Sequence, residues 1–326
     1  AGGARRAAWL EVGRRRRSWG GRKTAAVLTR GGLAPPAPST VTAIVKRAGL
    51  PLGLAGGGVA AFQRFERAQP NELWQMDFKG HVALRRGRLH PLTVLDDHSR
   101  FNLVLAACPD QRGNTVREQL IAAFRRYGLP DTLITDNGPP WGDGRGGAFT
   151  PLGVFLIEQG IRVAHAAPYH PQTMGKDERF HRTLKAELLA GPPFADLAQA
   201  ERAFRHWRTV YNHERPHEAL AMAVPAERYR ASPRAYRDII EPFDYAPGDL
   251  VRRVHQNGAI AFHGRNWPLS RAFAGKLVAL RPTTRDGVFT AVFRHQIIRS
   301  VDLTAATDTD ETVTHVPEHM SPMSPV

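Results

Sequence analysis

The chain has 326 residues, and its 45 Lys and Arg residues against 30 Asp and Glu residues give a formal net charge of +15. A chain of this length is expected to fold into two or three domains. The basic excess, supplied mainly by arginine, indicates a nucleic-acid partner because guanidinium groups bind phosphate in a bidentate manner; a bias toward arginine codons is the alternative explanation.

Cysteine content and apolar runs set further limits. The single cysteine, Cys108, excludes an intrachain disulfide and a zinc site built from several cysteines. No run of about 18 apolar residues occurs, so we expect no membrane span. Arg5 and Arg6 are followed by further arginines, unlike a signal peptide. We therefore expect a cytoplasmic, nucleoid-associated protein, and an upstream segment missing from this chain because residue 1 is not Met.

The amino-terminal segment, residues 1–66, is Arg-rich and has few large apolar residues. Three short helices are expected, at 4–12, 21–29 and 40–48. Ser39 and Thr40 are candidate N-caps of the third helix, and Gly49 is expected to end it.

Two short helices around a Gly/Pro turn, the second ending in Lys46-Arg47, are similar to a helix-turn-helix. In that motif the second helix enters the major groove, so Lys46 and Arg47 are candidate DNA contacts. A plain helical linker module is the alternative. The glycine-rich stretch 53–60 is expected to be a flexible linker.

The central segment, residues 67–232, alternates strand and helix patterns. The expected strands are 73–78, 89–96, 101–108, 133–135 and 161–164, with a hairpin turn at 85–87. The expected helices are one capped by Asn114 or Thr115 and ended by Gly128, one starting at Thr150-Pro151, and a largely helical region at 194–231. Three antiparallel strands followed by alternating elements predict a mixed α/β sheet with helices on its faces.

Two carboxylates in this segment call for an explanation. Asp77 stands mid-strand among apolar neighbours, where an unpaired carboxylate costs several kcal/mol, so it needs a cation, a metal or a strong hydrogen-bond partner. Asp136 follows a strand, where α/β sheets commonly carry catalytic groups, although Asp136-Asn137-Gly138 is also a good turn by itself. Asp96 and Asp97 lie near Arg100, and we interpret them as turn-capping or ion-paired residues.

A polar loop from Tyr169 leads into a helix that starts near Lys176. Its apolar stripe is formed by Phe180, Leu184, Leu188 and Leu189. Glu178, Arg182 and Lys185 share another face if the helix is unbroken. This face suits a metal ion and a phosphate backbone; a solvated face with one Glu–Arg pair is the alternative.

The carboxy-terminal segment, residues 233–304, has short β patterns separated by Gly and Asn turns. They cover 250–254, 259–262, 276–281, 288–293 and 295–300 and predict a small β domain. Arg252 and Arg253 are candidate DNA contacts, and oligomerisation is the alternative role of this domain. Residues 305–326 are polar and acidic and are expected to be disordered.

Several separated motifs, in the right order, resemble one family. They are Trp74-Gln75-Met76-Asp77, Thr135-Asp136-Asn137-Gly138-Pro139-Pro140, Tyr169-His170-Pro171-Gln172-Thr173 with Gly175 and Glu178, and the run Tyr211 to Leu220. Together they are similar to DDE transposases of the insertion-sequence type, whose catalytic core is like that of retroviral integrases. The resemblance covers residues 70–232.

The resemblance implies an RNase H-like fold for the core and a small SH3-like β-barrel after it. It also implies that Asp77, Asp136 and Glu178 form a catalytic triad holding two Mg²⁺ ions, with Mn²⁺ as a substitute. Two hard cations suit the in-line phosphoryl transfers of DNA cutting and joining, with Asp77 bridging both ions and Asp136 and Glu178 each holding one.

Basic and polar residues near Glu178 are the expected DNA contacts of the core. They are Tyr169, Gln172, Lys176, Arg182 and Lys185, whereas His170 is either a turn residue or a proton shuttle. Two departures from retroviral integrases are visible. A Gly-rich insertion at 141–147 is expected to form a loop beside the active site, and the amino-terminal zinc module has no cysteines to build it.

We therefore predict a DNA transposase that cuts and joins transposon ends by a two-metal mechanism. Its expected partners are the terminal inverted repeats, target DNA, and further copies of the chain in a synaptic complex. A DNA-binding regulator with an inactive integrase-like core is the alternative of a different class, and a non-specific RNase H-like nuclease is a third.

Overall fold

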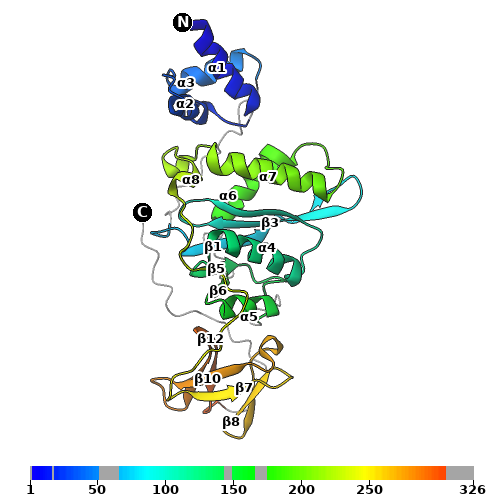
Figure 1. Cartoon of the computed structure of the whole chain (residues 1–326), viewed down its shortest axis with the longest axis vertical. Helices are drawn as coiled ribbons and strands as arrows, with labels where there is room; N and C mark the ends of the chain where they lie inside the picture. Colours follow the sequence, from blue (N-terminus) through cyan, green and yellow to red (C-terminus); the bar gives the residue numbers. More distant parts are fainter. Residues whose placement is uncertain (1, 17, 51–65, 143–148, 166–174, 306–326) are drawn as a thin grey trace.

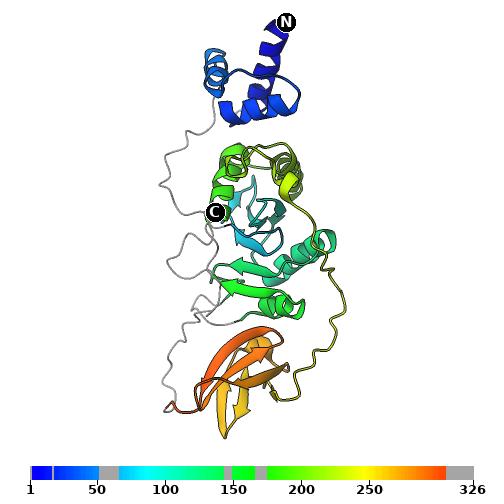
Figure 2. The ribbon, with the colours of Figure 1, turned by 90° about the vertical axis from the view of Figure 1, so that its left-hand side faces the viewer.

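A computed structural model of the chain describes residues 2–16, 18–50, 66–142, 149–165 and 175–305. These residues form a three-helix module, a central α/β domain and a carboxy-terminal β module, which follow one another along the long axis in Figures 1 and 2. The predicted linker 53–60 and residues 306–326 of the predicted tail lie outside the described ranges. Within these ranges, no helix has the length and apolar character needed to cross a membrane.

The three-helix module consists of α1 (Gly2–Arg15), α2 (Gly21–Arg30) and α3 (Pro38–Arg47). Its small core packs Ala25 against Val41 and Val45. The predicted caps Ser39 and Thr40 are wrong, because α3 begins at Pro38, with Ala37 as N-cap. Proline suits this position since its fixed φ fits a helix and the first turn leaves its missing N–H without cost. Gly49 does follow α3, at a φ of 70°.

The central sheet contains β1 (Leu73–Phe78), β2 (Val82–Ala83), β3 (Arg88–Asp96), β4 (Asn102–Cys108), β5 (Thr132–Thr135) and β6 (Arg162–His165). Its order is β2-β3-β1-β5-β6, with β4 paired to β3; β1 is antiparallel to β3 and parallel to β5. The predicted mixed sheet is confirmed, and its arrangement fits an RNase H-like core. The predicted hairpin turn is also present, since Gly87 adopts a φ of 88° and accepts a hydrogen bond from the Leu84 N–H.

Helices cover both faces of this sheet (Figure 1). On one face lie α4 (Gly113–Tyr127) and α5 (Pro151–Glu158), and on the other α6 (Gly175–Leu184) and α7 (Leu197–His213). Helix α5 starts at Thr150-Pro151 as predicted, and Thr150 caps it by accepting a hydrogen bond from the Gly153 N–H at 3.3 Å. The predicted caps of α4 are wrong: Arg112 is the N-cap, and the Thr115 hydroxyl donates instead to Asp110 at 2.7 Å.

The predicted shared face of Glu178, Arg182 and Lys185 required an unbroken α-helix. Helix α6 instead ends at Leu184. A π-helical turn, Lys185–Leu189, follows Leu184 directly. The wider turn brings Glu187 to Arg215 at 2.9 Å and to the Trp207 indole N–H at 3.2 Å. Both members of the Glu187–Arg215 ion pair are 9% exposed. Long-range contacts of these buried groups therefore accompany the change of helix type.

The segment after α7 contains η3 (Glu218–Leu220) and α8 (Pro225–Arg228). The three-helix module lies against it through three arginine–glutamate pairs: Arg16–Glu214 at 2.5 Å, Arg30–Glu227 at 3.3 Å and Arg22–Glu218 at 3.7 Å. Partly exposed pairs of this kind contribute about 0–1 kcal/mol each. The contact between the two parts is therefore mainly electrostatic and is expected to weaken at high salt.

The carboxy-terminal module has two sheets. One contains β12 (Gln296–Asp302), β11 (Val288–Phe293), β10 (Leu277–Pro282) and β7 (Leu250–Arg253), in that order, and the other pairs β8 (Ala259–Phe262) with β9 (Arg265–Pro268). The strand β9 was not predicted, because its exposed Arg265 and Asn266 and its terminal Pro268 lack a strand pattern. The SH3-like barrel remains a prediction.

This β module packs against α5 and the edge strand β6, as Figure 2 shows. The Gln296 side-chain oxygen accepts a hydrogen bond from the Val163 N–H of β6 at 3.2 Å, and Lys276 pairs with Glu158 of α5 at 2.5 Å. The Gln296 contact satisfies a backbone donor of an edge strand that would otherwise need water or another strand.

Candidate active site

Alternation along β1 places Asp77 on the face of the sheet that α6 covers. Trp74, Met76 and Phe78 point into the core beneath α4 and α5, so Gln75 and Asp77 face α6. The Asp77 side chain is 31% exposed, and its carboxylate accepts a hydrogen bond from the Phe78 N–H at 2.7 Å. Burial, with the nearby negative charge of Asp136, raises the pKa of Asp77 to about 6.

Asp136 follows β5, the parallel neighbour of β1. The register pairs Gln75 with Ile134, and two further residues along each strand lead to Asp77 and Asp136. Adjacent strands are about 4.8 Å apart, so the sheet itself sets the two carboxylates side by side. Asp136 is exposed, and it also serves the predicted turn by accepting a hydrogen bond from the Gly138 N–H at 3.0 Å.

The backbone at Asp136 is held by two donors. The Thr135 hydroxyl and the His165 Nδ1–H both lie 3.0 Å from the Asp136 carbonyl oxygen. Since a carbonyl only accepts, His165 carries its proton on Nδ1 in this contact. Strand β6 thereby fixes the position of the residue that ends β5.

On α6 the two acidic residues differ in direction. Glu178 is exposed, and within the described part of the chain its carboxylate has no hydrogen bond or ion pair. Asp177 is 1% exposed and faces the sheet, where Oδ1 accepts from the Thr93 hydroxyl at 3.1 Å and its backbone N–H donates to Gln75 at 3.3 Å. The structure therefore brings Asp77 and Asp136 together, but it places Asp177 rather than Glu178 against Asp77.

His181 completes this inner cluster. Its Nε2 lies 2.9 Å from the Thr93 hydroxyl and 3.2 Å from Asp177 Oδ2, and its Nδ1 lies 3.9 Å from Asp77 Oδ2. Burial lowers the pKa of His181 to about 3, so the imidazole is neutral at physiological pH. Burial, together with the charge of Asp77, raises the pKa of Asp177 well above its ordinary value.

Asp177 and His181 were missed by the sequence analysis, although a signal for them exists. Asp177, Phe180, His181 and Leu184 follow the spacing of one helical face, and all four are buried. An acidic and an imidazole side chain on the core-facing stripe of a helix, four residues apart, mark a polar cluster that needs partners in the fold.

These side chains suit a cation. Ligand atoms of Asp77, Asp177 and His181 all lie within 4.8 Å of one another, and Asp177 Oδ2 has no hydrogen-bond partner in the described structure. Burial and the nearby charge of Asp136 raise the pKa of Asp77, an effect that a divalent cation at this position reverses. Carboxylate oxygens are the ligands that Mg²⁺ prefers.

The predicted DNA contacts of the core differ in their exposure to solvent. Arg182 and Lys185 lie on the outer side of the helix, whereas Lys176 is engaged in an ion pair with Asp97 at 2.5 Å and its side chain is only 18% exposed. Tyr169 and Gln172, and His170 with them, lie outside the described residues. The ion pair ties the start of α6 to the β3–β4 turn, which favours a positioning role for Lys176.

Asp96 and Asp97 behave as interpreted from the sequence. The Asp96 carboxylate caps the β3–β4 turn by accepting from the Ser99 N–H at 2.8 Å, and Asp97 is ion-paired, with Lys176 as its partner. Neither carboxylate is part of the cluster around Asp77.

The predicted contacts in the flanking modules are at least partly exposed. Lys46 and Arg47 end α3, with the Arg47 guanidinium donating to the Ala43 carbonyl oxygen at 3.3 Å. Arg252 lies over the Phe262 ring at 5.7 Å, and Arg253 donates to the Gly275 carbonyl oxygen at 2.8 Å. All four side chains can reach solvent, as phosphate contacts require.

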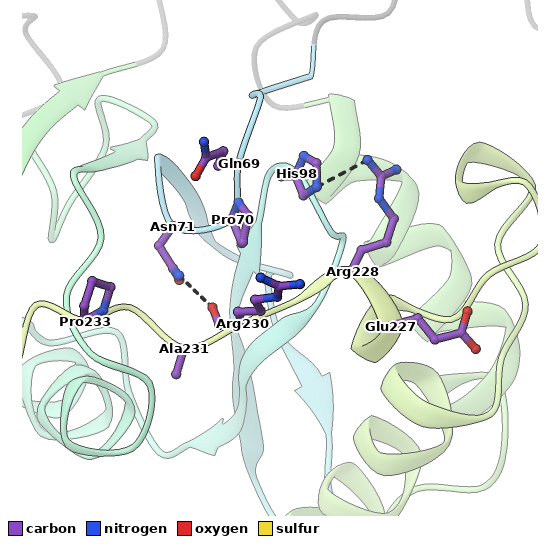
Figure 3. Close-up of a pocket in the computed structure, with 9 residues that line it drawn as sticks. All are labelled: Gln69, Pro70, Asn71, His98, Glu227, Arg228, Arg230, Ala231 and Pro233. Carbon is purple, nitrogen blue, oxygen red and sulfur yellow. Dashed lines mark hydrogen bonds between the residues drawn. The ribbon is translucent and has the colours of Figure 1, made fainter.

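A polar pocket of about 600 Å³ lies elsewhere, at the amino end of β1 (Figure 3). His98, Arg228 and Arg230 line it, and the Asn71 side chain donates to the Arg230 carbonyl oxygen at 2.8 Å. Arg228 is occupied by an ion pair with Glu66 at 2.8 Å. Asp77 stands toward the other end of the strand, so this pocket is separate from the carboxylates.

Comparisons with known proteins agree with this architecture. Residues 67–171 and 159–225 match the integrase core domain family, and residues 249–309 match the carboxy-terminal domain of IS481 family transposases. Among solved structures, the HTLV-2 integrase catalytic core domain in complex with magnesium aligns with 16% identity and a TM-score of 0.38, covering 49% of this chain and 97% of that one.

Two curated relatives come from bacterial insertion elements. An uncharacterised 31.7 kDa protein of IS407 from Burkholderia multivorans is 28% identical over 52% of this chain and 62% of its own length. The putative transposase of IS5376 from Geobacillus stearothermophilus is 25% identical over 72% of this chain and 59% of its own length. The matches thus span about 60% of these relatives. Through its matches to the integrase core domain and to the IS481-type carboxy-terminal domain, the chain is similar to insertion-sequence transposases that have an integrase-like core.

Proposed function

We propose that this chain is a DNA transposase that cuts and joins transposon ends by metal-dependent phosphoryl transfer at Asp77, Asp136 and Glu178. The single observation that carries the proposal is the register between β1 and β5, which pairs Gln75 with Ile134 two residues before Asp77 and Asp136. Burial and the nearby charge of Asp136 raise the pKa of Asp77, a cost that a bound cation removes.

The three carboxylates would differ in the metal ions that they hold. Asp77 would hold both ions because it lies between Asp136 and α6, and Asp136 would hold one of them. Glu178 projects from the first turn of α6, whose position is fixed by Lys176–Asp97 and by Asp177. Two Mg²⁺ ions, when bound, activate the attacking oxygen and stabilise the leaving oxygen of the phosphodiester.

The DNA partner is supported by charge and exposure. The formal net charge is +15, and Arg182 and Lys185 are accessible to solvent just beyond Glu178. We assign phosphate binding to them, and base readout to the three-helix module through Lys46 and Arg47. Assembly of several copies on the transposon ends is part of the proposal, since cutting and joining require two ends to be held together.

Asp77→Asn, Asp136→Asn and Glu178→Gln test the triad separately. Each is expected to lower Mg²⁺-dependent cleavage of a terminal-repeat duplex by about 10³-fold, since removing a ligand takes away several kcal/mol of transition-state stabilisation. DNA binding should remain, because arginine and lysine make the phosphate contacts. The matched control is Glu118→Gln, an exposed glutamate of α4 across the sheet, which should leave cleavage unchanged.

The duplex for this assay comes from the paired inverted repeats that are expected to flank the coding region. Full cleavage by one of the three variants would remove that residue from the triad. Unmeasurable cleavage by the wild-type chain, with specific binding to the repeats intact, would instead support the regulator with an inactive core.

Replacing Arg182 and Lys185 together by Ala tests the phosphate contacts. The dependence of log K on log salt concentration is expected to flatten by about 0.9 for each phosphate that is no longer neutralised on duplex DNA. An unchanged slope would return both side chains to a solvated surface.

A further inference from the structure

We propose that His181 is a further metal ligand, through Nδ1 and beside Asp77, and that Asp177 and Thr93 hold its ring in the ligating tautomer. This inference rests on the proposed function, because the ion it concerns is one that Asp77 binds. It concerns residues outside the predicted triad, and the contacts that carry it all lie between β1, β3 and α6.

The hydrogen bonds around the Thr93 hydroxyl determine which nitrogen of His181 carries the proton. Its oxygen lies 3.0 Å from the Asp77 carbonyl oxygen, 3.1 Å from Asp177 Oδ1 and 2.9 Å from His181 Nε2. The first two neighbours are oxygen acceptors, and the hydroxyl has one proton to give. When that proton goes to either of them, the imidazole must donate, so Nε2 carries its hydrogen.

Asp177 favours the same tautomer. Its Oδ2 lies 3.2 Å from Nε2 and has no hydrogen-bond partner in the described structure. In the ionised form of Asp177, which a cation at Asp77 favours, a lone pair on Nε2 would face this oxygen unfavourably, whereas an N–H presents a partial positive charge to it. Residue 177 is one helical turn before residue 181 and buried, so it can serve the ring without contacting solvent.

The position of the lone pair follows from the tautomer. A neutral imidazole with its hydrogen on Nε2 has its lone pair on Nδ1. Nδ1 lies 3.9 Å from Asp77 Oδ2, a distance too long for a hydrogen bond. Two acceptors therefore face each other near the carboxylate that is proposed to bind metal.

Their separation fits a shared ion. Nitrogen and oxygen ligands lie about 2.0–2.2 Å from a divalent first-row metal or Mg²⁺, so two ligands of one ion are at most about 4.4 Å apart. The observed 3.9 Å lies inside that limit. A ligating histidine whose other N–H is held by a carboxylate network is the usual arrangement in metalloproteins.

An imidazole ligand changes which ion is favoured. Mg²⁺ prefers oxygen ligands, whereas imidazole suits transition metals. A site with His181 beside Asp77 should therefore favour Mn²⁺ over Mg²⁺ more strongly than a site made of carboxylates alone. Mn²⁺ is also the probe for the test, because its electron spin reports on the nuclei bound to it.

The experiment is electron spin-echo envelope modulation on the full chain loaded with Mn²⁺, together with Mn²⁺ and Mg²⁺ titrations. Wild type should show nitrogen modulation from a directly bound imidazole, and His181→Asn should lose it. Mn²⁺ affinity should fall about 10–100-fold in His181→Asn and by a smaller factor in Asp177→Asn, which removes only the outer carboxylate. Mg²⁺ affinity should change less than Mn²⁺ affinity in both variants.

The matched control is His206→Asn, an exposed histidine of α7, which should keep both the modulation and the affinity. Bound Mn²⁺ without nitrogen modulation in the wild type would overturn the inference and leave the proposed function standing. If His181→Asn does not fold, His181→Gln provides the assignment, since an amide side chain cannot supply the imidazole modulation. Retained Mn²⁺ affinity in Asp77→Asn would instead contradict the proposed function itself.

Discussion

Replacing Lys176 by Met separates two roles for this side chain, a DNA contact and a tether of α6. The sequence analysis assigned Lys176 to DNA, whereas the structure pairs its ammonium with Asp97 at 2.5 Å. Asp97 is 2% exposed, and its carboxylate also accepts from the Gln75 amide at 2.8 Å and the Arg67 N–H at 2.9 Å. If Lys176 tethers α6, Lys176→Met should lose stability. If Lys176 contacts DNA, the variant's DNA binding should depend less on salt.

The size of the stability loss follows from these partners. Removing one member of a buried ion pair costs about 3–5 kcal/mol because the other charge is left uncompensated. Asp97 keeps two donors, so we expect the lower end, about 3 kcal/mol, for Lys176→Met. The double variant Lys176→Met/Asp97→Asn should recover most of it. Urea unfolding of wild type, both single variants and the double variant measures this coupling.

The pH dependence gives a second readout. Burial, helped by the charge of Arg100, lowers the pKa of Lys176 to about 8 against 10.5 in the unfolded chain. The unfolded chain therefore binds more protons between about pH 8 and 10.5, and stability should rise with pH over that window. Lys176→Met should remove part of this rise, the rest belonging to Lys23, whose pKa burial also lowers to about 8.

The result that refutes the tether is specific. A Lys176→Met variant of wild-type stability, whose DNA binding has a salt slope flatter by about 0.9, would make Lys176 a phosphate contact after all.

Other side chains lead to further expectations. Arg215→Ala should lower the free energy of unfolding by about 3 kcal/mol in urea titrations, because it strands the buried Glu187 carboxylate. In metal-free protein the pKa of Asp77 is about 6, so the folded state keeps its proton to a higher pH than the unfolded chain does. The free energy of unfolding should therefore fall as pH rises from about 4 to 6. Asp77→Asn should flatten this fall when unfolding is measured across that pH range. Reversing the charge of Lys276 or of Glu158 alone should lower the free energy of unfolding by about 1 kcal/mol, and exchanging both charges should recover it. A double-mutant cycle measures this coupling.

Local patterns predicted the elements of the sheet well. Strand β1 has the predicted bounds, Leu73–Phe78, because large apolar side chains alternate with Gln75 and Asp77 and the core demands that alternation. The start of α5 was predicted at Thr150-Pro151 because a hydroxyl directly before a proline is a local signal. Such features depend on residues within one turn or strand.

Features set by distant contacts were not predictable in this way. The π-helical turn after Leu184 accompanies contacts of Glu187 with Arg215 and Trp207, which are 28 and 20 residues away along the chain. The cap of α4 was missed because Asp110 takes the Thr115 hydroxyl that was expected to cap the helix. In both cases a partner outside the element determined the local conformation.

The candidate site likewise contains residues that the sequence predicted and residues that it did not. Asp77 and Asp136 were identified from their positions in strands, and the register between β1 and β5 brings them together. The inward side of α6 was not fully recognised, because the apolar stripe was followed from Phe180 toward Leu189 and its polar members were not noticed. Asp177 and His181 lie on that stripe, and their partner Thr93 is 84 and 88 residues distant.

The first turn of α6 is tied to the sheet at three points, which decides what each part of the helix does. Lys176 pairs with Asp97, the Asp177 N–H donates to Gln75, and the Asp177 carboxylate accepts from Thr93. Asp77 lies in β1 and Asp136 follows β5 directly, so the position of the proposed third ligand, Glu178, depends on how this turn is held. Changes in the first turn should therefore alter metal binding, whereas changes one or two turns later, at solvent-facing side chains, should alter DNA binding alone.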